Sequence, residues 1–261
     1  TDGKIVVGGH SKGTPTTCSL NPNFVHTVCW TIARYNTDGS LDVSFGNGGI
    51  AFSSVRDGTD SEIIHRLAIQ TDGKIVAVGT AFNLGVVRYN TNGSEDFKDL
   101  IVIPNSFSHQ PTFFPTTPAG ELAASGTTVR IQQDGKIIIG GNAGDHMFLL
   151  RLNQNNSFDT TFGIGGLRRV GIMALDFTND IVLQQDNNIV SVGGGCTTSN
   201  CSTGVDTIVA GFTSGGSLDS TFGSGGIVIN SFSTGSDSAS SVLIQPQNNK
   251  IIVGGHQGLE L

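Results

Sequence analysis

The sequence predicts an all-β protein built from repeated four-stranded antiparallel sheets, and three observations support this. A strand-turn-strand segment that closes on glycine recurs at residues 1–9, 69–79, 131–141, 183–193 and 244–255. The position after its turn recurs about every sixty residues, a spacing typical of propellers and solenoids, at Lys4, Lys74, Lys136, Asn188 and Lys250. Only 13% of the residues are charged and 37 are glycine, which suits a turn-rich β protein.

Each repeat contains four strand candidates, taken here in chain order. The first, such as residues 64–70, leads into a second at 74–79, which is apolar on both faces, as expected of a strand covered on both sides. Asp72 and Gly73 join them, and we expect a two-residue hairpin connection with positive φ values. The third strand is expected at 84–90. The fourth follows a Phe-Gly-x-Gly-Gly element, as at 49–54.

That element belongs to a second recurring signature, which spans residues 40–49, 157–166 and 217–226. We expect Asp42 to cap a short helical turn that carries the aromatic residue inward. The three aromatic residues are then packing wedges between neighbouring sheets: Phe45, Phe162 and Phe222. Irregular packing is expected in two repeats, because residues 94–97 lack the Phe-Gly element and Gly211 replaces the arginine found at Arg34, Arg88 and Arg151.

The two signatures, best seen at residues 67–79 and 33–49, resemble the delta-60 repeat family, and the resemblance covers essentially the whole chain. It implies blades of a β-propeller in secreted or surface-attached bacterial proteins, with no catalytic motif. The predicted fold is therefore a β-propeller of four-stranded antiparallel blades, with about four to five blades in this chain.

We expect residues 1–261 to form a single propeller domain that starts and ends within a repeat. The chain holds three complete sets of four strands, a leading set without its first strand and a trailing set with only its first two. Unpaired strand edges favour aggregation, so closure is expected, either within the chain, with a partner chain or in a larger ring. The alternatives of a longer polypeptide and of self-association both remain open.

The composition excludes several classes of partner. With Lys+Arg 14 against Asp+Glu 21, a net charge of -7 and no basic cluster, nucleic acid is not an expected partner. No apolar run approaches the roughly 20 residues of a membrane-spanning helix. No cofactor is expected, because the Gly-Gly runs lack the Lys-Ser/Thr of a phosphate loop and the Asp-Gly turns offer too few oxygens for calcium.

The four cysteines form two close pairs within polar insertions, Cys18 with Cys29 and Cys196 with Cys201. Local disulfides are the simplest interpretation and would indicate an oxidising compartment. Zinc ligands or free thiols are the alternatives, but the spacing does not match a zinc finger, so no metal site is expected.

Insertions gather in the connections between second and third strands and between fourth and first strands, which share one rim of a blade. Loops on a rigid scaffold commonly carry function, so this rim is the candidate site. Polar pairs open each first strand there, and the predicted ligand-binding residues are His65, Arg66, Thr128, Asn179, Asp180 and Ser241. They form either a shallow pocket for a sugar or a carboxylate, or a solvated channel wall without a ligand.

Three functions fit these features. The leading hypothesis is a secreted or cell-surface scaffold for binding or adhesion, with a glycan or protein ligand. The alternative is an extracellular hydrolase or lyase that acts on a polysaccharide or ester at the channel mouth, using paired acids or a His-Asp pair such as His146 with Asp145. The third is a purely structural module. No catalytic motif is recognised, so enzyme activity remains an open question.

Overall fold

The computed structural model describes residues 2–12, 28–55, 62–81, 83–104, 112–113 and 123–258. Within these ranges the chain forms strands and turns, and no helix there is long and apolar enough to cross a membrane. The strands are β1 (Ile5–Ser11), β2 (Cys29–Tyr35), β3 (Ile50–Ser53), β4 (Glu62–Ile69), β5 (Ile75–Ala81), β6 (Asn83–Tyr89), β7 (Glu95–Val102), β8 (Thr112–Phe113), β9 (Ala124–Ile131), β10 (Ile137–Ala143), β11 (His146–Leu152), β12 (Leu167–Val170), β13 (Leu175–Leu183), β14 (Ile189–Cys196), β15 (Asp206–Phe212), β16 (Ile227–Asn230), β17 (Asp237–Ile244) and β18 (Ile251–Gln257).

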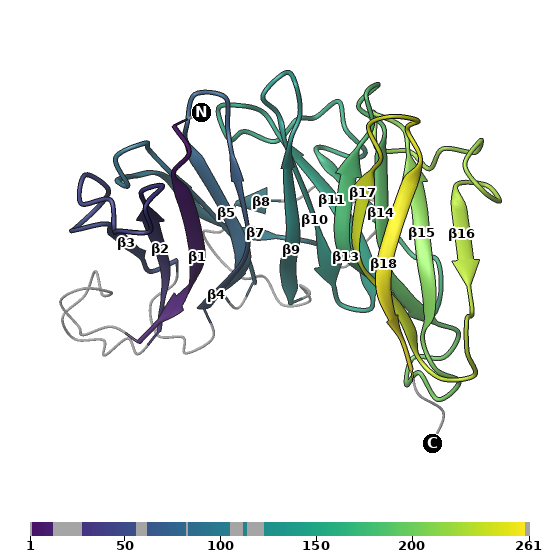
Figure 1. Cartoon of the computed structure of the whole chain (residues 1–261). Helices are drawn as coiled ribbons and strands as arrows, with labels where there is room; N and C mark the ends of the chain where they lie inside the picture. The colour runs from purple at the N-terminus through teal and green to yellow at the C-terminus, as the bar shows by residue number, and fades with distance from the viewer. Residues whose placement is uncertain are drawn as a thin grey trace. The chain divides into compact units, whose positions relative to one another are not determined.

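The strands pair in chain order, which confirms the all-β prediction and the four-stranded blades (Figure 1). The sheets are β1-β2-β3, β4-β5-β6-β7-β8, β12-β11-β10-β9, β13-β14-β15-β16 and β17-β18. The leading blade thus lacks a first strand, the trailing blade has two strands, and the second blade carries the additional strand β8. Much of the predicted insertions, residues 13–27, 56–61, 105–111 and 114–122, lies outside the described residues.

The chain divides into two compact units, and the boundary falls within β9. The first unit contains Thr1–Ile103 and Thr112–Val129, and the second contains Pro104–Pro111 and Arg130–Leu261. That residues 1–261 form one domain stays a prediction.

The connection between first and second strands is not the two-residue turn that the sequence predicts. The amide of Gln70 donates to the carbonyl of Lys74 at 2.8 Å, and the amide of Gly73 donates to Gln70 at 2.9 Å. Three residues, 71–73, therefore lie in the loop, and only Gly73 has a positive φ, of 83°. This is a type I turn followed by a left-handed residue, which is a common three-residue hairpin.

Three closing glycines, Gly79, Gly193 and Gly255, face an irregularity in the preceding strand. In β4, Ile64 pairs with Gly79 and Arg66 with Val78, so His65 is an extra, bulged residue. Asn179 in β13 and Ser240 in β17 hold the same place. A Cβ atom on Gly79 would lie 1.9 Å from the carbonyl oxygen of Ile63. The bulge therefore explains why the repeat closes on glycine.

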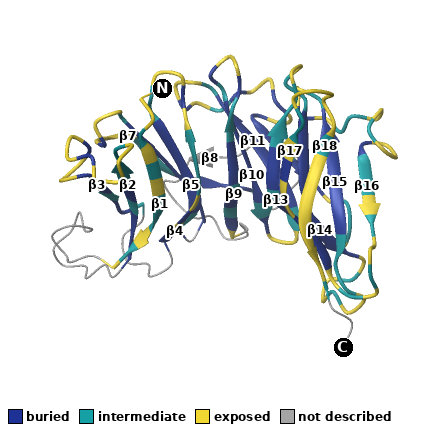
Figure 2. Cartoon of the chain, viewed as in Figure 1, coloured by how far each residue is buried: buried dark blue, intermediate teal, exposed yellow. Residues whose placement is uncertain are grey.

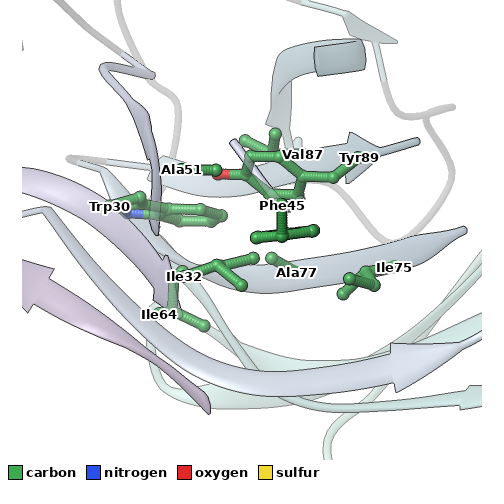
Figure 3. Packing of buried hydrophobic residues seen from close by; sticks show 9 residues of the cluster. All are labelled: Trp30, Ile32, Phe45, Ala51, Ile64, Ile75, Ala77, Val87 and Tyr89. Carbon is green, nitrogen blue, oxygen red and sulfur yellow. The ribbon is translucent and has the colours of Figure 1, made fainter. Parts of the chain in front are cut away.

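The predicted wedge role is confirmed for Phe45 in the first unit. Its side chain is fully buried in a cluster that joins two blades (Figure 3). Trp30 and Ile32 come from β2, and Ile75 and Tyr89 come from β5 and β6. The amide of the next residue, Gly46, also donates to the carbonyl of Asn92 in the following blade at 2.7 Å.

Phe162 repeats this arrangement in the second unit, where it is fully buried against β13, β14 and β15. The amide of Gly163 donates to the carbonyl of Gly215 at 3.0 Å. Phe222 is only half-buried. A Cβ atom on Gly211 would lie 2.5 Å from the Phe222 ring, so this aromatic side chain covers the position where the other repeats carry arginine.

The remaining signature residues form ion pairs around the same element. In the second unit, Arg151 Nε lies 2.7 Å and Lys136 Nζ 3.1 Å from the carboxylate of Asp159. The Arg151 guanidinium also stacks over the Phe162 ring, 4.6 Å from its centre, and donates to the carbonyl of Ser214 in the next blade. Lys4, Arg34 and Asp42 repeat these contacts in the first unit. The recurring signature is thus accounted for by packing.

A second strand is buried inside a four-stranded sheet and exposed where it is the last strand of its sheet, as Figure 2 shows for β14 and β18. Strand β14 is buried along its whole length, as predicted for a second strand with two apolar faces. Strand β18 has the same pattern in sequence, yet Ile252 and Val253 are 46% and 37% exposed.

Candidate functional site

Asp180 is the best-connected of the predicted ligand-binding residues. Its side chain is 4% exposed, and its Oδ1 atom accepts a hydrogen bond from the Arg130 guanidinium at 2.7 Å. Its Oδ2 atom accepts from the Ser241 hydroxyl at 3.3 Å and from the Val242 amide at 3.2 Å. The carboxylate thus joins the first strands of neighbouring blades.

Asn179 and Ser241 lie in the same network of the second unit. The Asn179 amide nitrogen donates to the carbonyl of Ala239 at 2.7 Å and contacts the Ser238 hydroxyl at 3.3 Å. The structure therefore brings Asn179, Asp180 and Ser241 together. Sequence reasoning missed Arg130, which lies two residues after the predicted Thr128 on β9.

The other predicted residues, His65, Arg66 and Thr128, belong to the first unit. His65 is exposed, and its Nε2 atom lies 3.1 Å from the hydroxyl of Thr80. Burial and the nearby charge of Arg66 lower the pKa of His65. The Nε atom of Arg66 is buried and has no hydrogen-bond partner within the described structure, and Thr128 is buried. Convergence of His65 and Arg66 with Asp180 stays a prediction.

A buried acid opens three of the first strands and holds the preceding connection in place. Glu62 accepts from the Val55 amide at 3.2 Å. Asp237 accepts from the Phe232 and Ser233 amides at 2.7 and 2.8 Å. Asp176 has the same role. All three lie eight residues before a recurring glutamine, a spacing that would have revealed them in the sequence.

The sequence suggested a pair of His146 with Asp145. In the structure, His146 pairs instead with the buried acid Asp176. His146 Nδ1 lies 3.1 Å from Asp176 Oδ2. The same carboxylate accepts from the amides of Met147 and Ile172 at 2.9 and 2.8 Å, and from Met173 at 3.2 Å. Asp145 contributes only its carbonyl, which accepts from the Asp176 amide.

Beside this pair the surface is hollowed over a volume of about 600 Å³. Its lining includes His146, Gly171 and Met173, together with two arginines of β12, Arg168 and Arg169. Arg169 donates to the carbonyls of Pro104 at 3.0 Å and Ala143 at 3.2 Å. The hollow extends along β12 from its connection to β13, on the rim that the sequence favours, to Leu218 on the connection between β15 and β16.

Cys196 and Cys201 form a disulfide, which confirms that prediction. Cys29 is also disulfide-bonded, whereas its predicted partner Cys18 lies outside the described residues. Across the described ranges, His, Cys, Asp and Glu side chains do not gather in groups of three that could hold a metal ion.

Comparison with known proteins identifies the repeat. Residues 24–45, 70–96 and 132–162 match the family described as "Domain of unknown function (DUF5122) beta-propeller", which is less than half of the chain. The last two segments contain most of a hairpin each, and the first and third end at the phenylalanine of the Phe-Gly element, Phe45 and Phe162. A search of the curated proteins finds no match.

Three solved structures match this chain at low sequence identity. A protein of unknown function from Bacteroides caccae has 14% identity and a TM-score of 0.45, and the match covers 85% of this chain and 60% of that one. The Dos1 propeller has 8% identity and a TM-score of 0.41, and the match covers 87% of this chain and 61% of that one. A "putative exo-beta-1,3-galactanase" from Bifidobacterium bifidum s17 has 13% identity and a TM-score of 0.38, with 94% and 74% covered.

The chain therefore spans about 60% of the length of the first two structures. The antiparallel blades and the matched segments together identify the fold of this chain as a β-propeller, three segments of which match the DUF5122 family.

Proposed function

We propose that the chain is a binding scaffold that works outside the cytoplasm and takes a glycan as its ligand on the loop-bearing rim. The observation that carries this proposal is that the recurring residues and the non-recurring polar residues have different contacts. The recurring lysine, arginine, aspartate and phenylalanine are used in packing between blades, as at Lys136, Arg151, Asp159 and Phe162. The polar residues that depart from the repeat surround a hollow on the opposite rim.

The engaged carboxylates favour binding over hydrolysis. A general acid or base needs to exchange a proton with the substrate. Asp176 already accepts from three amides and from His146, and Asp180 accepts from Arg130, Ser241 and an amide. Both carboxylates therefore act as anchors that hold the rim in shape.

The disulfides favour a secreted or cell-surface location. Cys196 and Cys201 are joined across a separation of five residues, and structural disulfides persist mainly in oxidising compartments. A protein ligand in place of a glycan, and a hydrolase or lyase acting on a polysaccharide or ester, are outcomes that the following experiment separates.

The test is a glycan array probed with the purified chain, followed by titration calorimetry on each hit and an assay with chromogenic glycosides and esters. Saturable binding to a glycan without turnover supports the proposal. Turnover that is lost in Asp180→Asn or His65→Ala would support the enzyme instead. Saturable binding to extracellular proteins with an empty array would assign the rim to a protein partner.

A further inference from the structure

We propose that the hollow beside β12 binds the anionic group of an acidic sugar, with Arg168 as the residue that contacts its carboxylate or sulfate. This inference rests on the proposed glycan-binding function and names the class of glycan. It concerns the second unit alone.

The repeat itself shows that arginine is not needed at this position for the fold. Strands β3, β12 and β16 each start directly after a Phe-Gly-x-Gly-Gly element, so Arg168 corresponds to Ala51 and Val228. Ala51 is 5% exposed within the first hydrophobic cluster, and Val228 packs against the cluster of β14, β15 and β17. A small or medium apolar side chain therefore satisfies the packing between blades.

Arg168 instead brings a guanidinium to the edge of this interface without giving it a protein partner. Its Nε atom is buried and makes no hydrogen bond within the described structure. Buried polar groups in folded proteins are nearly always paired, and an unpaired one is unfavourable. A planar guanidinium is also the side chain best suited to a bidentate contact with a carboxylate or sulfate.

Among the described residues, no carboxylate forms an ion pair with Arg168 beside the hollow. The Arg169 guanidinium donates hydrogen bonds to the carbonyls of Pro104 and Ala143, and the negative charge of Asp176 stabilises its positive charge. On a chain with a net charge of -7, a local positive site selects an anionic ligand over a neutral one.

The shape of the hollow fits a sugar residue. Its volume of about 600 Å³ lies within the roughly 300–1,000 Å³ typical of small-ligand sites. Asp176 fixes the His146 ring on one side. The backbone at Gly171 approaches that ring so closely that a Cβ atom there would lie 3.1 Å from Cε1. Together with Met173, the ring offers surface against which a pyranose can pack.

The experiment is titration calorimetry of the intact chain with three probes: a galacturonic acid disaccharide, the neutral galactose disaccharide and galactose 6-sulfate. We expect the anionic probes to bind at least tenfold more tightly than the neutral one, with an affinity that falls as salt is raised. Binding of the uronide alone assigns a carboxylate site, and binding of both anionic probes assigns a general oxyanion site. Either result supports the inference.

Arg168→Ala should weaken binding of the anionic probe at least tenfold while its melting temperature stays the same or rises, because Ala51 occupies the same place in β3. Lys250→Ala is the matched control: it removes the same charge from an exposed position on the opposite turn. Unchanged binding in Arg168→Ala, or a lower melting temperature, overturns the inference. Tight binding of a neutral glycan overturns it but leaves the proposed function intact, and binding to no glycan overturns both.

Discussion

At the scale of single residues, the closing glycine and the polar pair of the preceding strand have one cause. The first strand bulges at His65, Asn179 and Ser240, and the carbonyl before each bulge turns toward a glycine of the second strand. The polar pairs that the sequence marks as candidate ligands therefore sit on a distorted stretch of strand. A bulge re-aims side chains, and here it turns Asp180 toward its neighbours.

Replacement of the closing glycine should be costly only where a bulge faces it. In Gly79→Ala the new Cβ would lie 1.9 Å from a carbonyl oxygen, and we expect a loss of about 3 kcal/mol in the free energy of unfolding. Gly9 holds the same repeat position, but nothing lies within 4 Å of a Cβ there, so Gly9→Ala should change stability little. Urea denaturation of both variants checks this, and equal losses would show that the bulge is not the reason.

Asp180→Asn should destabilise the second unit. The variant removes the charge that pairs with Arg130 and turns an acceptor into a donor opposite the Val242 amide. We expect a loss of about 2 kcal/mol, since hydrogen bonds to charged groups contribute about 1.5–3 kcal/mol. Ser241→Ala removes only the 3.3 Å hydroxyl contact and should lose less than half as much in the same urea titration. A neutral Asp180→Asn variant would contradict the structural role.

At the scale of elements, the Phe-Gly turns at Phe45 and Phe162 each link one blade to the next. Phe162 fills the interface, Gly163 donates to the carbonyl of Gly215, and Arg151 reaches the carbonyl of Ser214. The following turn must place a glycine against the ring, because a Cβ atom on Gly216 would lie 2.7 Å from it. The Phe162 side chain of one blade thus requires a glycine at position 216 of the following blade.

Phe162→Ala should therefore cost about 4 kcal/mol, within the range for removing a fully buried aromatic side chain. Phe222→Ala is the matched control, because Phe222 holds the same repeat position but is half-buried over Gly211. We expect its loss to be less than half as large. Thermal unfolding followed by near-ultraviolet circular dichroism measures both, and equal losses would refute the interblade role.

The ion pairs of this turn predict a loss of stability in acid. Burial acts to raise the pKa of Asp159, but hydrogen bonds from Thr161 and Lys136 and the charge of Arg151 outweigh it, so its pKa lies well below the usual 3.8. The ionised form therefore stabilises the fold above about pH 4, and this contribution disappears as the pH falls further.

The comparison of Asp159→Asn with the parent protein tests this. The variant should be less stable at pH 7, and the difference should shrink as the pH is lowered from 4 to 2. Asp219→Asn is the control, because Gly211 and Asn188 replace the arginine and lysine of that repeat, and its effect should be smaller. Guanidinium titrations at each pH give the free energy of unfolding of each protein. A difference between Asp159→Asn and the parent protein that does not depend on pH would exclude the carboxylate as the cause.

At the scale of the whole molecule, the chain is a series of repeats, and neighbouring blades within each unit contact each other, as β1 contacts β4 and β14 contacts β17. In such proteins the free energy of unfolding is roughly the sum of the stabilities of the repeats and of the interfaces between them. A local cross-link within one repeat therefore has a measurable effect. The Cys196–Cys201 disulfide is one such cross-link: it closes the connection between β14 and β15.

Cys196→Ser with Cys201→Ser should lower the free energy of unfolding by about 2 kcal/mol, as expected for closure of a short loop. A reducing agent should lower the stability of the parent protein by more than this, because it also opens the disulfide of Cys29, and the double variant should show only that second loss. Unfolding curves with and without reductant give both quantities. A parent protein whose Cys196 and Cys201 are reduced after export would contradict the proposed compartment.

The sequence predicted the strands well because their signals are local. The apolar runs of β5 and β14, the Asp-Gly turns and the Phe-Gly wedges depend on residues close together in the chain. The site was predicted less well. Asp176 was overlooked in favour of Asp145, because the partner of His146 comes from the following blade, thirty residues further along the chain.

The amino-acid sequence by itself determined the repeat, the order of strands in each blade and the disulfide at Cys196, since each follows from local pattern and spacing. Only the tertiary structure decided what the polar residues do. It buried Asp180 in an ion pair and placed Arg168 beside a hollow with its Nε atom unpaired within the described residues, because these outcomes depend on which blades meet and how closely their backbones approach.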